Sequence, residues 1–429
     1  MGKRFDVVVV GGGLVGAAAA AALARPSLRV CGSDAPAGVV ALLDLGGGGP
    51  KAKVGSSHGA SRIIRRTYAS EHLTALMPTA YSLWDSIDPD LIRRVGGVDF
   101  AKPGNECFAA VLRSADACGV PYTTAPPPGH THALQVPEGW QAIYQPDAGV
   151  LRADAARAKL LSIAADEGVE IMHNTPATRF ERCDGRWKIL IGDGGVIDTK
   201  RIIVAAGTHT RRLLLNSGLP APPLRVRRVT AAFWRQNQSK HDDATDVFRH
   251  HPIFIDYETG LYGLFDEDHP LHFKVSDHDG PLLDFAADAG EAAHTFEEHQ
   301  FASRGACDTK LPPIIRGLFG DDLDASPHGP AHAEPCTYTM SPDEEFVIGH
   351  ADEERTVVVA SCCSGHGAKL APVSGALAAH AALEPRGQLP ETPLSGGWNM
   401  RSACAHFDIC RPALQDPNFP GAYAVHQPS

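Results

Sequence analysis

One cysteine and a set of histidine, arginine and lysine side chains are the residues of this 429-residue chain most capable of chemistry. Cys336 lies in the polar stretch EPCTYTMSPDEEFVIG, where a thiol could be core filler, a disulfide partner, a metal ligand or a nucleophile. The ten cysteines include no CxxC pair, which argues against a structural zinc site. This cysteine usage fits a reduced, intracellular protein, and the residues alone leave the role of Cys336 open.

The first group of cations lies in the stretch GSSHGASRIIRRTY. His58, Arg62 and Arg65 are spaced four and three residues apart, which predicts that they share one face of a helix. Two guanidinium groups and an imidazole on one face would suit an anion or a cofactor. A solvated basic edge of a helix is the alternative, and this stretch alone does not decide between them.

Two lysines stand out by their positions. Lys274 belongs to HPLHFKVSDH, whose alternation predicts a strand with His272, Lys274, Ser276 and His278 on one face. Such a face is usually only solvated, but a lysine that lines a closed pocket would be a point charge in a low dielectric. Lys369 follows the glycine turn of SGHGAKLAPVSG at the start of an alanine-rich helix. A helix N-terminus disfavours a cation, so this position favours a role toward a ligand.

The N-terminus supplies the clearest element for positioning a ligand. The run DVVVVGGGLVGAAAAAALA predicts a buried strand, a glycine turn and a helix, with Gly11, Gly13 and Gly16 in GxGxxG spacing. The helix N-terminus would face phosphates with its free N–H groups. The next run, LRVCGSD, is expected to form the second strand and to end at Asp34, where an acid would bind a ribose hydroxyl. Together these features predict a dinucleotide site, without deciding between NAD and FAD.

The remaining patterns indicate the fold class. RIIVAAG indicates a strand that returns to the dinucleotide sheet, and TVVVAS precedes a second glycine turn and helix. Residues 225 to 334 are strand-like and rich in loops, which predicts a second domain inserted into the first. The fold class is therefore α/β: a Rossmann-like domain with an inserted antiparallel or mixed sheet.

The net charge and the two ends of the sequence limit which partners and which cellular location we expect. The formal net charge of −11 argues against nucleic acid as a partner. Three glycines inside the apolar run 7–24 argue against a membrane span or a signal segment there. The last residues, HQPS, carry no peroxisomal signal. We therefore expect a cytoplasmic protein that does not bind a membrane.

In this order the motifs resemble a known family pattern. VVVVGGGLVG, GSSHGASRIIRRTY, HFKVSDH, CTYTMSPDEEFVIG and SGHGAKLAPVSG are similar to motifs of the monomeric sarcosine oxidase and L-pipecolate oxidase group, within the D-amino-acid-oxidase-like flavoproteins. The resemblance implies FAD as the cofactor. It implies an FAD-binding domain of residues 1–88, 145–222 and 333–385, a substrate domain of residues 89–144 and 223–332, and a C-terminal tail of residues 386–429.

The resemblance also implies roles around the cofactor. Cys336 would be a covalent tether, a thioether to the 8α-methyl of FAD. His58 and Arg62 would lie against the flavin ring, and Lys274 would activate oxygen as a fixed cation. The other residues implied at the cofactor are Gly11, Gly13, Gly16, Asp34, Ser57, Gly207, Gly365, Gly367 and Lys369.

A second set of roles concerns the substrate. Arg65 and Lys369 would bind its carboxylate, and Tyr262 and His278 would lie beside its amine. The implied reaction oxidises a secondary α-amino acid, such as sarcosine or L-pipecolate, to an imine and reduces O2 to H2O2. The partners would be the amino acid and O2, and the protein would be a monomer.

The sequence departs from the family pattern around the second glycine turn. Cys362 and Cys363 precede SGHG, where the family usually has Gly-Phe, and Ala368 follows it, where the family usually has Phe. The loss of an aromatic wall could enlarge the substrate pocket. A related flavoprotein acting on a larger amine, glycated or biosynthetic, is therefore one alternative. A flavin-binding sensor without turnover is another.

Overall fold

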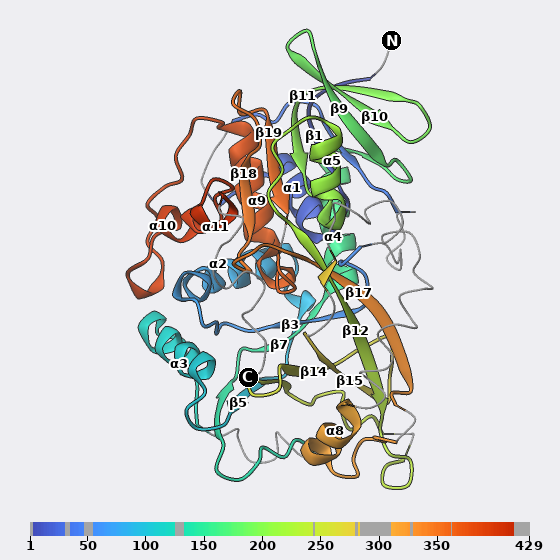
Figure 1. Cartoon of the computed structure of the whole chain (residues 1–429), viewed down its shortest axis with the longest axis vertical. Helices are drawn as coiled ribbons and strands as arrows, with labels where there is room; N and C mark the ends of the chain where they lie inside the picture. Colours follow the sequence, from blue (N-terminus) through green and yellow to red (C-terminus); the bar gives the residue numbers. More distant parts are fainter. Residues whose placement is uncertain are drawn as a thin grey trace.

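The computed structural model describes residues 3–30, 35–46, 55–124, 133–242, 245–278, 282–283, 310–326, 329–361 and 363–415. Two large sheets occupy the two ends of the molecule, and a three-stranded sheet lies between them (Figure 1). The α/β fold class predicted from the sequence is confirmed, with a parallel dinucleotide-type sheet and a second, mostly antiparallel sheet.

The first large sheet has the strand order β18-β19-β11-β1-β2-β8, with the hairpin β9–β10 joined to β11. Its strands are β1 (Arg4–Val10), β2 (Val40–Leu43), β8 (Glu170–Met172), β9 (Ala177–Cys183), β10 (Arg186–Ile191), β11 (Val196–Val204), β18 (Val347–His350) and β19 (Val357–Ser361). β11, the predicted returning strand, pairs with β1 in parallel, and β19 pairs with β11 in the same way. Both strand–turn–helix units predicted from the sequence are confirmed.

Strand alternation gives this sheet two buried faces. Val7 and Val9 pack among helices, whereas Val8 and Val10 pack against the hairpin side. The helices of the first face are α1 (Leu14–Ala24), α2 (Glu71–Ile87), α4 (Ala153–Asp166) and α9 (Ala371–Leu383), and α5 (Thr210–Asn216) lies on the second face. The alanine-rich α1 and α9 approach closely, since a Cβ on Gly375 would lie 2.5 Å from the backbone of Ala18.

The second large sheet has the order β16-β12-β15-β14-β13-β5-β6, with β17 beside β12. Its strands are β5 (Gly97–Ala101), β6 (Gln141–Gln145), β12 (Arg225–Arg235), β13 (Ile253–Asp256), β14 (Leu261–Phe265), β15 (His272–Asp277), β16 (Leu282–Leu283) and β17 (His332–Met340). Helix α8 (Leu311–Phe319) covers a core of aromatic side chains that includes Trp234, Phe254 and Phe273. Helix α3 (Glu106–Cys118) packs beside α2.

Two local predictions are wrong. The stretch carrying His58, Arg62 and Arg65 is a loop followed by β3 (Ser61–Ile64), which pairs with β7 (Gly149–Arg152) in the small sheet completed by β4 (Ile92–Arg94). Two adjacent β-branched isoleucines and an available partner strand outweigh the helical spacing of the cations.

The second strand of the dinucleotide sheet is also misplaced in the prediction. Residues Pro26–Leu28 form a 3₁₀ turn, and the strand beside β1 is β2, which comes later in the chain. Asp34 lies outside the described residues. The residue that follows β2 is Asp44, so this acid takes the place at the strand end that was predicted for Asp34.

The segment after α9 returns to the first sheet and its helices. Helices α10 (Met400–Ala405) and α11 (Pro412–Gln415) bury Met400 and Leu414 in the cores on the two faces of that sheet, and Phe407, between the two helices, is buried with Met400. Within the described ranges, no helix combines the length and the apolar character needed to cross a membrane.

Candidate active site

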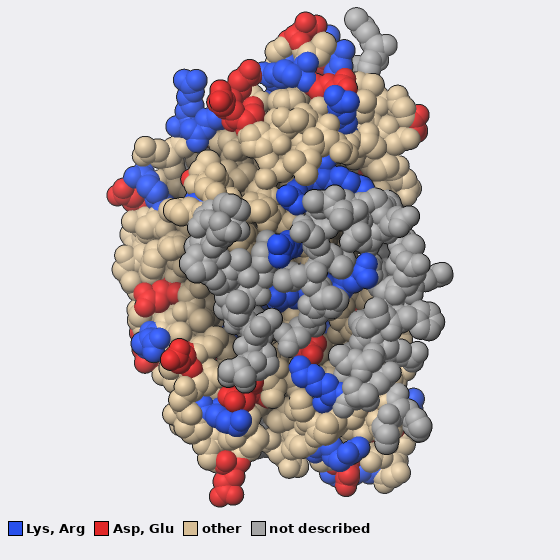
Figure 2. Space-filling model, in the orientation of Figure 1, with Lys and Arg blue, Asp and Glu red and all other residues tan. Residues whose placement is uncertain are grey.

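A cavity of about 930 Å³ lies where the sheets meet. It is lined by the glycine turn before α1, by β3, by β15 and β17, and by the turn before α9. This volume lies within the range of cofactor and ligand pockets. Figure 2 shows several Lys and Arg side chains near the middle of one face of the molecule, with most of the visible Asp and Glu toward its edge.

The glycine turn at the start of α1 forms one end of the cavity. Gly11 has a φ of +113°, a conformation that favours glycine, and a Cβ on Gly16 would clash with the carbonyl oxygen of Gly11. The Leu14 N–H donates to Ser57 Oγ at 3.1 Å, and a Cβ on Gly13 would lie 2.9 Å from that same hydroxyl. Because these positions are glycines, no side chain covers the backbone of the turn on the cavity side, which suits a diphosphate at a helix N-terminus.

A buried ion pair borders this turn. Asp44 accepts from Arg157 Nη2 at 2.7 Å, and Arg157 Nε donates to the carbonyl of Gly12 at 2.5 Å. Both side chains are buried, and Asp44 lines the cavity. The arrangement places a carboxylate at the end of β2, where dinucleotide-binding folds hold a ribose.

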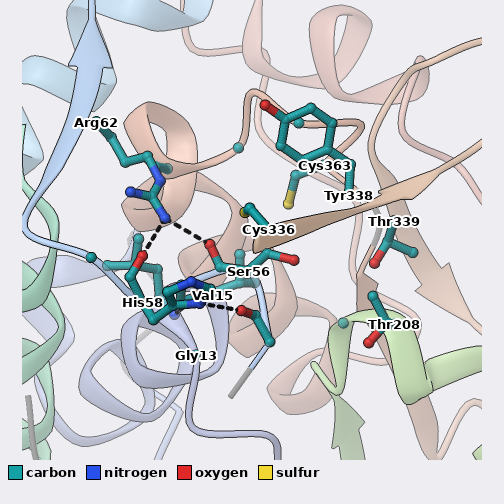
Figure 3. A pocket seen from close by; sticks show the side chains of 18 of the residues that line it. Gly13, Val15, Ser56, His58, Arg62, Thr208, Cys336, Tyr338, Thr339 and Cys363 are labelled. Carbon is teal, nitrogen blue, oxygen red and sulfur yellow. Dashed lines mark hydrogen bonds between the residues drawn. The ribbon is translucent and has the colours of Figure 1, made fainter. Parts of the chain in front are cut away.

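His58 and Arg62 lie on the next part of the wall. The guanidinium of Arg62 donates to the carbonyl oxygens of Ser56 (3.0 Å) and His58 (Figure 3). It also donates to the carbonyl oxygen of Ser61 at 2.7 Å. His58 Nδ1 contacts the Gly55 carbonyl at 2.5 Å. Burial, together with the nearby charge of Arg62, lowers the pKa of His58, so one fixed cation and a neutral imidazole face the cavity here.

Cys336 lies on β17, half-buried, and lines the cavity opposite these residues (Figure 3). Among the described residues, no two cysteines are joined by a disulfide, Cys336 and Cys363 included. A Cβ on Gly365 would lie 2.7 Å from the Tyr338 ring, and one on Gly367 would clash with Cys363. Gly207, with a φ of +54°, lines the cavity just after β11.

Lys274 points into the cavity from β15 and is almost completely buried. Its Nζ donates to the Ser61 carbonyl at 3.3 Å and lies 3.8 Å from Asp266 Oδ2. Burial lowers the pKa of Lys274, although Asp266 acts against this shift. The pKa of Asp266 is lowered despite its burial because His269, Lys274 and Ser61 stabilise the carboxylate.

Arg65 and Lys369 form a second pair of buried cations. Both lie over the ring of Tyr68, at 5.2 Å and 5.3 Å from its centroid. Arg65 Nη1 lies 3.4 Å from Oδ2 of the fully buried Asp99, which also accepts from Thr67 Oγ1 and from Gln145 Nε2 at 2.9 Å each. Burial and the neighbouring Arg65 lower the pKa of Lys369 to about 7.

Aromatic side chains complete the wall of the cavity. The rings of Tyr262 and His278 stack at 4.6 Å, and the Tyr338 hydroxyl lies 3.3 Å from His278 Nδ1. Burial raises the pKa of Tyr262 to about 12, so its hydroxyl keeps its proton. The structure thus brings the site residues predicted from the sequence to one cavity, apart from Gly16, which lies behind the glycine turn, and Asp34, which lies outside the described residues. The predicted residues that line the cavity are Gly11, Gly13, Ser57, His58, Arg62, Arg65, Gly207, Tyr262, Lys274, His278, Cys336, Gly365, Gly367 and Lys369.

Three carboxylates that the sequence prediction missed support these cations. Asp44, Asp99 and Asp266 are all buried, and each lies within 4 Å of an Arg or a Lys. Asp99 sits in the apolar run GVDFA, where an unpaired charge would be costly, so its position could have signalled a buried cation partner. Asp44 ends the apolar run VVALLD, the same signal that was assigned to Asp34.

Comparisons with known proteins identify the family of the chain. The family model DAO, described as FAD dependent oxidoreductase, matches residues 6–381. N-methyl-L-tryptophan oxidase of Salmonella arizonae is 28% identical over 410 residues, which cover 91% of this chain and 98% of that enzyme. NikD, an amino acid oxidase essential for nikkomycin biosynthesis, matches in structure with a TM-score of 0.71 at 20% identity, over 90% of this chain and 95% of NikD.

A further solved structure shows the same fold. L-proline dehydrogenase from P. horikoshii matches with a TM-score of 0.70 at 17% identity, over 91% of this chain and 96% of that one. The family model spans both large sheets and the residues of the cavity from Val10 to Lys369. The chain belongs to the DAO family of FAD-dependent oxidoreductases.

Proposed function

We propose that this protein oxidises the C–N bond of an N-methyl or other secondary α-amino acid, with FAD as its cofactor and O2 as the electron acceptor. The observation that carries this proposal is the placement of Arg65 and Lys369, two buried cations over one tyrosine, in the cavity that also contains Lys274 and Cys336. Paired cations bind a carboxylate, and a separate buried lysine can serve a different anion.

The bare glycine turn and Asp44 would hold the diphosphate and the ribose of FAD, and Cys336 would form a thioether to its ring. When bound there, FAD would accept the hydride equivalent from the amine and pass the electrons to oxygen. His58 and Arg62 would lie along the flavin ring, where the fixed positive charge of Arg62 would stabilise the negative charge that develops on the ring during reduction.

Arg65 and Lys369 would orient the substrate through its carboxylate. Asp99 holds the Arg65 guanidinium in place, and Tyr68 supports both cations from one side. A clamped carboxylate fixes the α-carbon and its amine relative to the cavity wall, which converts binding energy into orientation. With Asp99 ionised and Lys369 protonated, the three groups carry a net charge of one positive unit, which matches a monocarboxylate.

Tyr262 and His278 would lie beside the substrate amine. An amine must be neutral to give up a hydride equivalent, and a site lined with cations and aromatic rings disfavours its protonated form. Lys274, held between the Ser61 carbonyl and Asp266, would stabilise negative charge as oxygen is reduced.

The substrate is proposed to be larger than sarcosine. Ala368 and Cys363 line the cavity at the turn where aromatic side chains were expected, so room is left on that side. The N-methyl-L-tryptophan oxidase relative points the same way, toward an N-methyl amino acid with a bulky side chain.

Anaerobic bleaching of the flavin absorbance tests the proposal. N-methyl-L-tryptophan should bleach the flavin faster than sarcosine or L-pipecolate does. N-methyltryptamine, which lacks only the carboxylate, should be at least about 100-fold less effective because it cannot use the clamp. Admitting air should restore the oxidised spectrum and form H2O2. If no secondary amino acid bleaches the flavin, the proposal is wrong, and a sensor without turnover becomes the better description.

A further inference from the structure

A group of side chains beside the proposed reaction site has the composition of a metal site. His269, His332 and Glu334 each offer one ligand atom, and these atoms lie within 4.8 Å of one another. Two imidazoles and one carboxylate make up many zinc and non-haem iron sites. We propose that His269, His332 and Glu334 bind one divalent transition-metal ion, such as Zn²⁺, in the wall of the cavity.

Two of the ligands are fixed by one strand. His332 and Glu334 are two residues apart on β17, so their side chains project to the same side. The antiparallel pairing with β12 sets their backbone positions, with His332 opposite Phe233. His332 Nε2 and Glu334 Oε1 are already 3.4 Å apart. Cys336 is the next residue along this face, so the metal would lie beside the proposed flavin tether.

The third ligand comes from the connection between β14 and β15. His269 Nδ1 lies 3.2 Å from Asp266 Oδ1. A carboxylate on one ring nitrogen fixes the tautomer and directs the lone pair of the other nitrogen toward a metal, as it does around many zinc ions. The rings of His269 and His332 stack at 4.9 Å, and His269 also packs on Phe233 at 4.0 Å, which holds both imidazoles side by side.

The geometry favours an open site over a closed structural one. Zinc bonds of about 2.0–2.2 Å bring ligand atoms closer together than 4.8 Å, so the side chains must rotate inward slightly. The side chain of His332 is 44% exposed, which gives it that freedom. Three protein ligands leave a coordination position for water or a ligand. A bound ion would add positive charge to the wall on the far side of Asp266 from Lys274.

Zinc retention by the flavin-containing protein tests the proposal. The whole chain is stripped with a chelator, dialysed, and equilibrated against buffered micromolar free Zn²⁺. Elemental analysis should find one Zn²⁺ per chain in the wild type. Affinity should fall by about 100-fold or more in His332→Ala, and by about 10- to 100-fold in Asp266→Asn, which removes the charge that orients His269. Anomalous scattering at the zinc absorption edge should place the ion between His269 and His332.

His272→Ala is the matched control. Its ring lies 6.5 Å from that of His269, outside the three proposed ligands, so this variant should keep its zinc. The flavin spectrum and the unfolding midpoint show whether each variant is folded, and His332→Gln replaces His332→Ala if the latter is not. Retention of no Zn²⁺ by the wild type would overturn the site. Equal retention by wild type and all variants would do the same, because the metal would then be bound elsewhere.

Discussion

At the scale of single residues, the site is a set of buried cations with their own counter-charges. The sequence predicted the cations by their types and motifs, but not the carboxylates that hold them. Asp99 reaches Arg65 across 34 positions of the chain, and Asp44 reaches Arg157 across 113. Such pairs arise from strand pairing and domain packing, which local sequence patterns do not encode. The charge that each cation presents to a ligand therefore depends on contacts that only the fold reveals.

Lys369 should make the binding of carboxylates depend on pH. Its pKa of about 7 means that its charge is lost as the pH rises through 7, and a bound carboxylate favours the charged form. The affinity for indole-3-propionate, a carboxylate without an amine, should fall by up to about tenfold per pH unit above pH 7, with uptake of a proton on binding. Titration of the flavin spectrum between pH 6.5 and 9 measures this.

Lys369→Arg provides the control for that titration. A guanidinium stays charged over the whole range, so the affinity of the variant should be nearly independent of pH. An equally flat profile in the wild type would show that Lys369 is not the group that titrates in the clamp.

Cys336 should be the residue that retains the flavin under denaturing conditions. Acid precipitation of the wild type should leave the yellow colour in the pellet, because a thioether survives unfolding. Cys336→Ala should release the flavin into the supernatant. Cys363→Ala removes a second thiol from the same cavity and should keep the colour in the pellet. Release of all flavin from the wild type would contradict covalent attachment and leave the fold assignment intact.

At the scale of elements, periodic patterns predicted several strands and helices correctly. The alternating strand β15, the returning strand β11 and the alanine-rich α1 and α9 form as predicted. The prediction was wrong at His58 to Arg65, where charged residues at helical spacing lie in a loop and a strand. The spacing of charged residues is therefore a weaker sign of a helix than the spacing of apolar ones, because Arg62 and Arg65 reach the same cavity from an extended backbone.

The glycine turn should tolerate no side chain at Gly16. A Cβ there would clash with the carbonyl oxygen of Gly11, and neither backbone can move without shifting α1 from the sheet. Gly16→Ala should cost about 1–3 kcal/mol of unfolding free energy and lower the flavin content of the purified protein. Denaturant unfolding and the flavin-to-protein absorbance ratio measure the two effects.

Gly317→Ala is the comparison for that change. Gly317 lies inside α8, and an added Cβ would meet no atom within 4 Å, so the variant should gain up to about 1 kcal/mol and keep its flavin. If both variants lost similar amounts of stability and flavin, the clash between a Cβ at residue 16 and the Gly11 carbonyl would not be the cause of the loss in Gly16→Ala.

At the scale of the whole molecule, the cavity lies where two separate sheets meet. The glycine turn, Asp44 and Lys369 come from the first sheet and its helices, whereas Lys274, Tyr262 and Cys336 come from the second. The order of strands in the second sheet was not predicted, although the resemblance assigned residues 89–144, where β5 lies, to the same domain as residues 223–332. Pairings of this kind depend on tertiary packing rather than on local propensity.

The segment after residue 385 was predicted only as a tail, but several side chains in its described part, residues 386–415, belong to the core of the first sheet. Phe407 is 2% exposed, packs on Phe346 at 5.1 Å, and shares a core cluster with Leu370, the neighbour of Lys369. Phe407→Ala should therefore destabilise the protein by about 3–5 kcal/mol and weaken carboxylate binding, because the turn that carries Lys369 loses support. Leu215→Ala, at a side chain that is 54% exposed, should change the stability by no more than about 0.5 kcal/mol. Denaturant midpoints and indole-3-propionate titrations of both variants measure these effects. A Phe407→Ala protein as stable as Leu215→Ala would show that the segment is an appendage, and that the first sheet and its helices are complete without it.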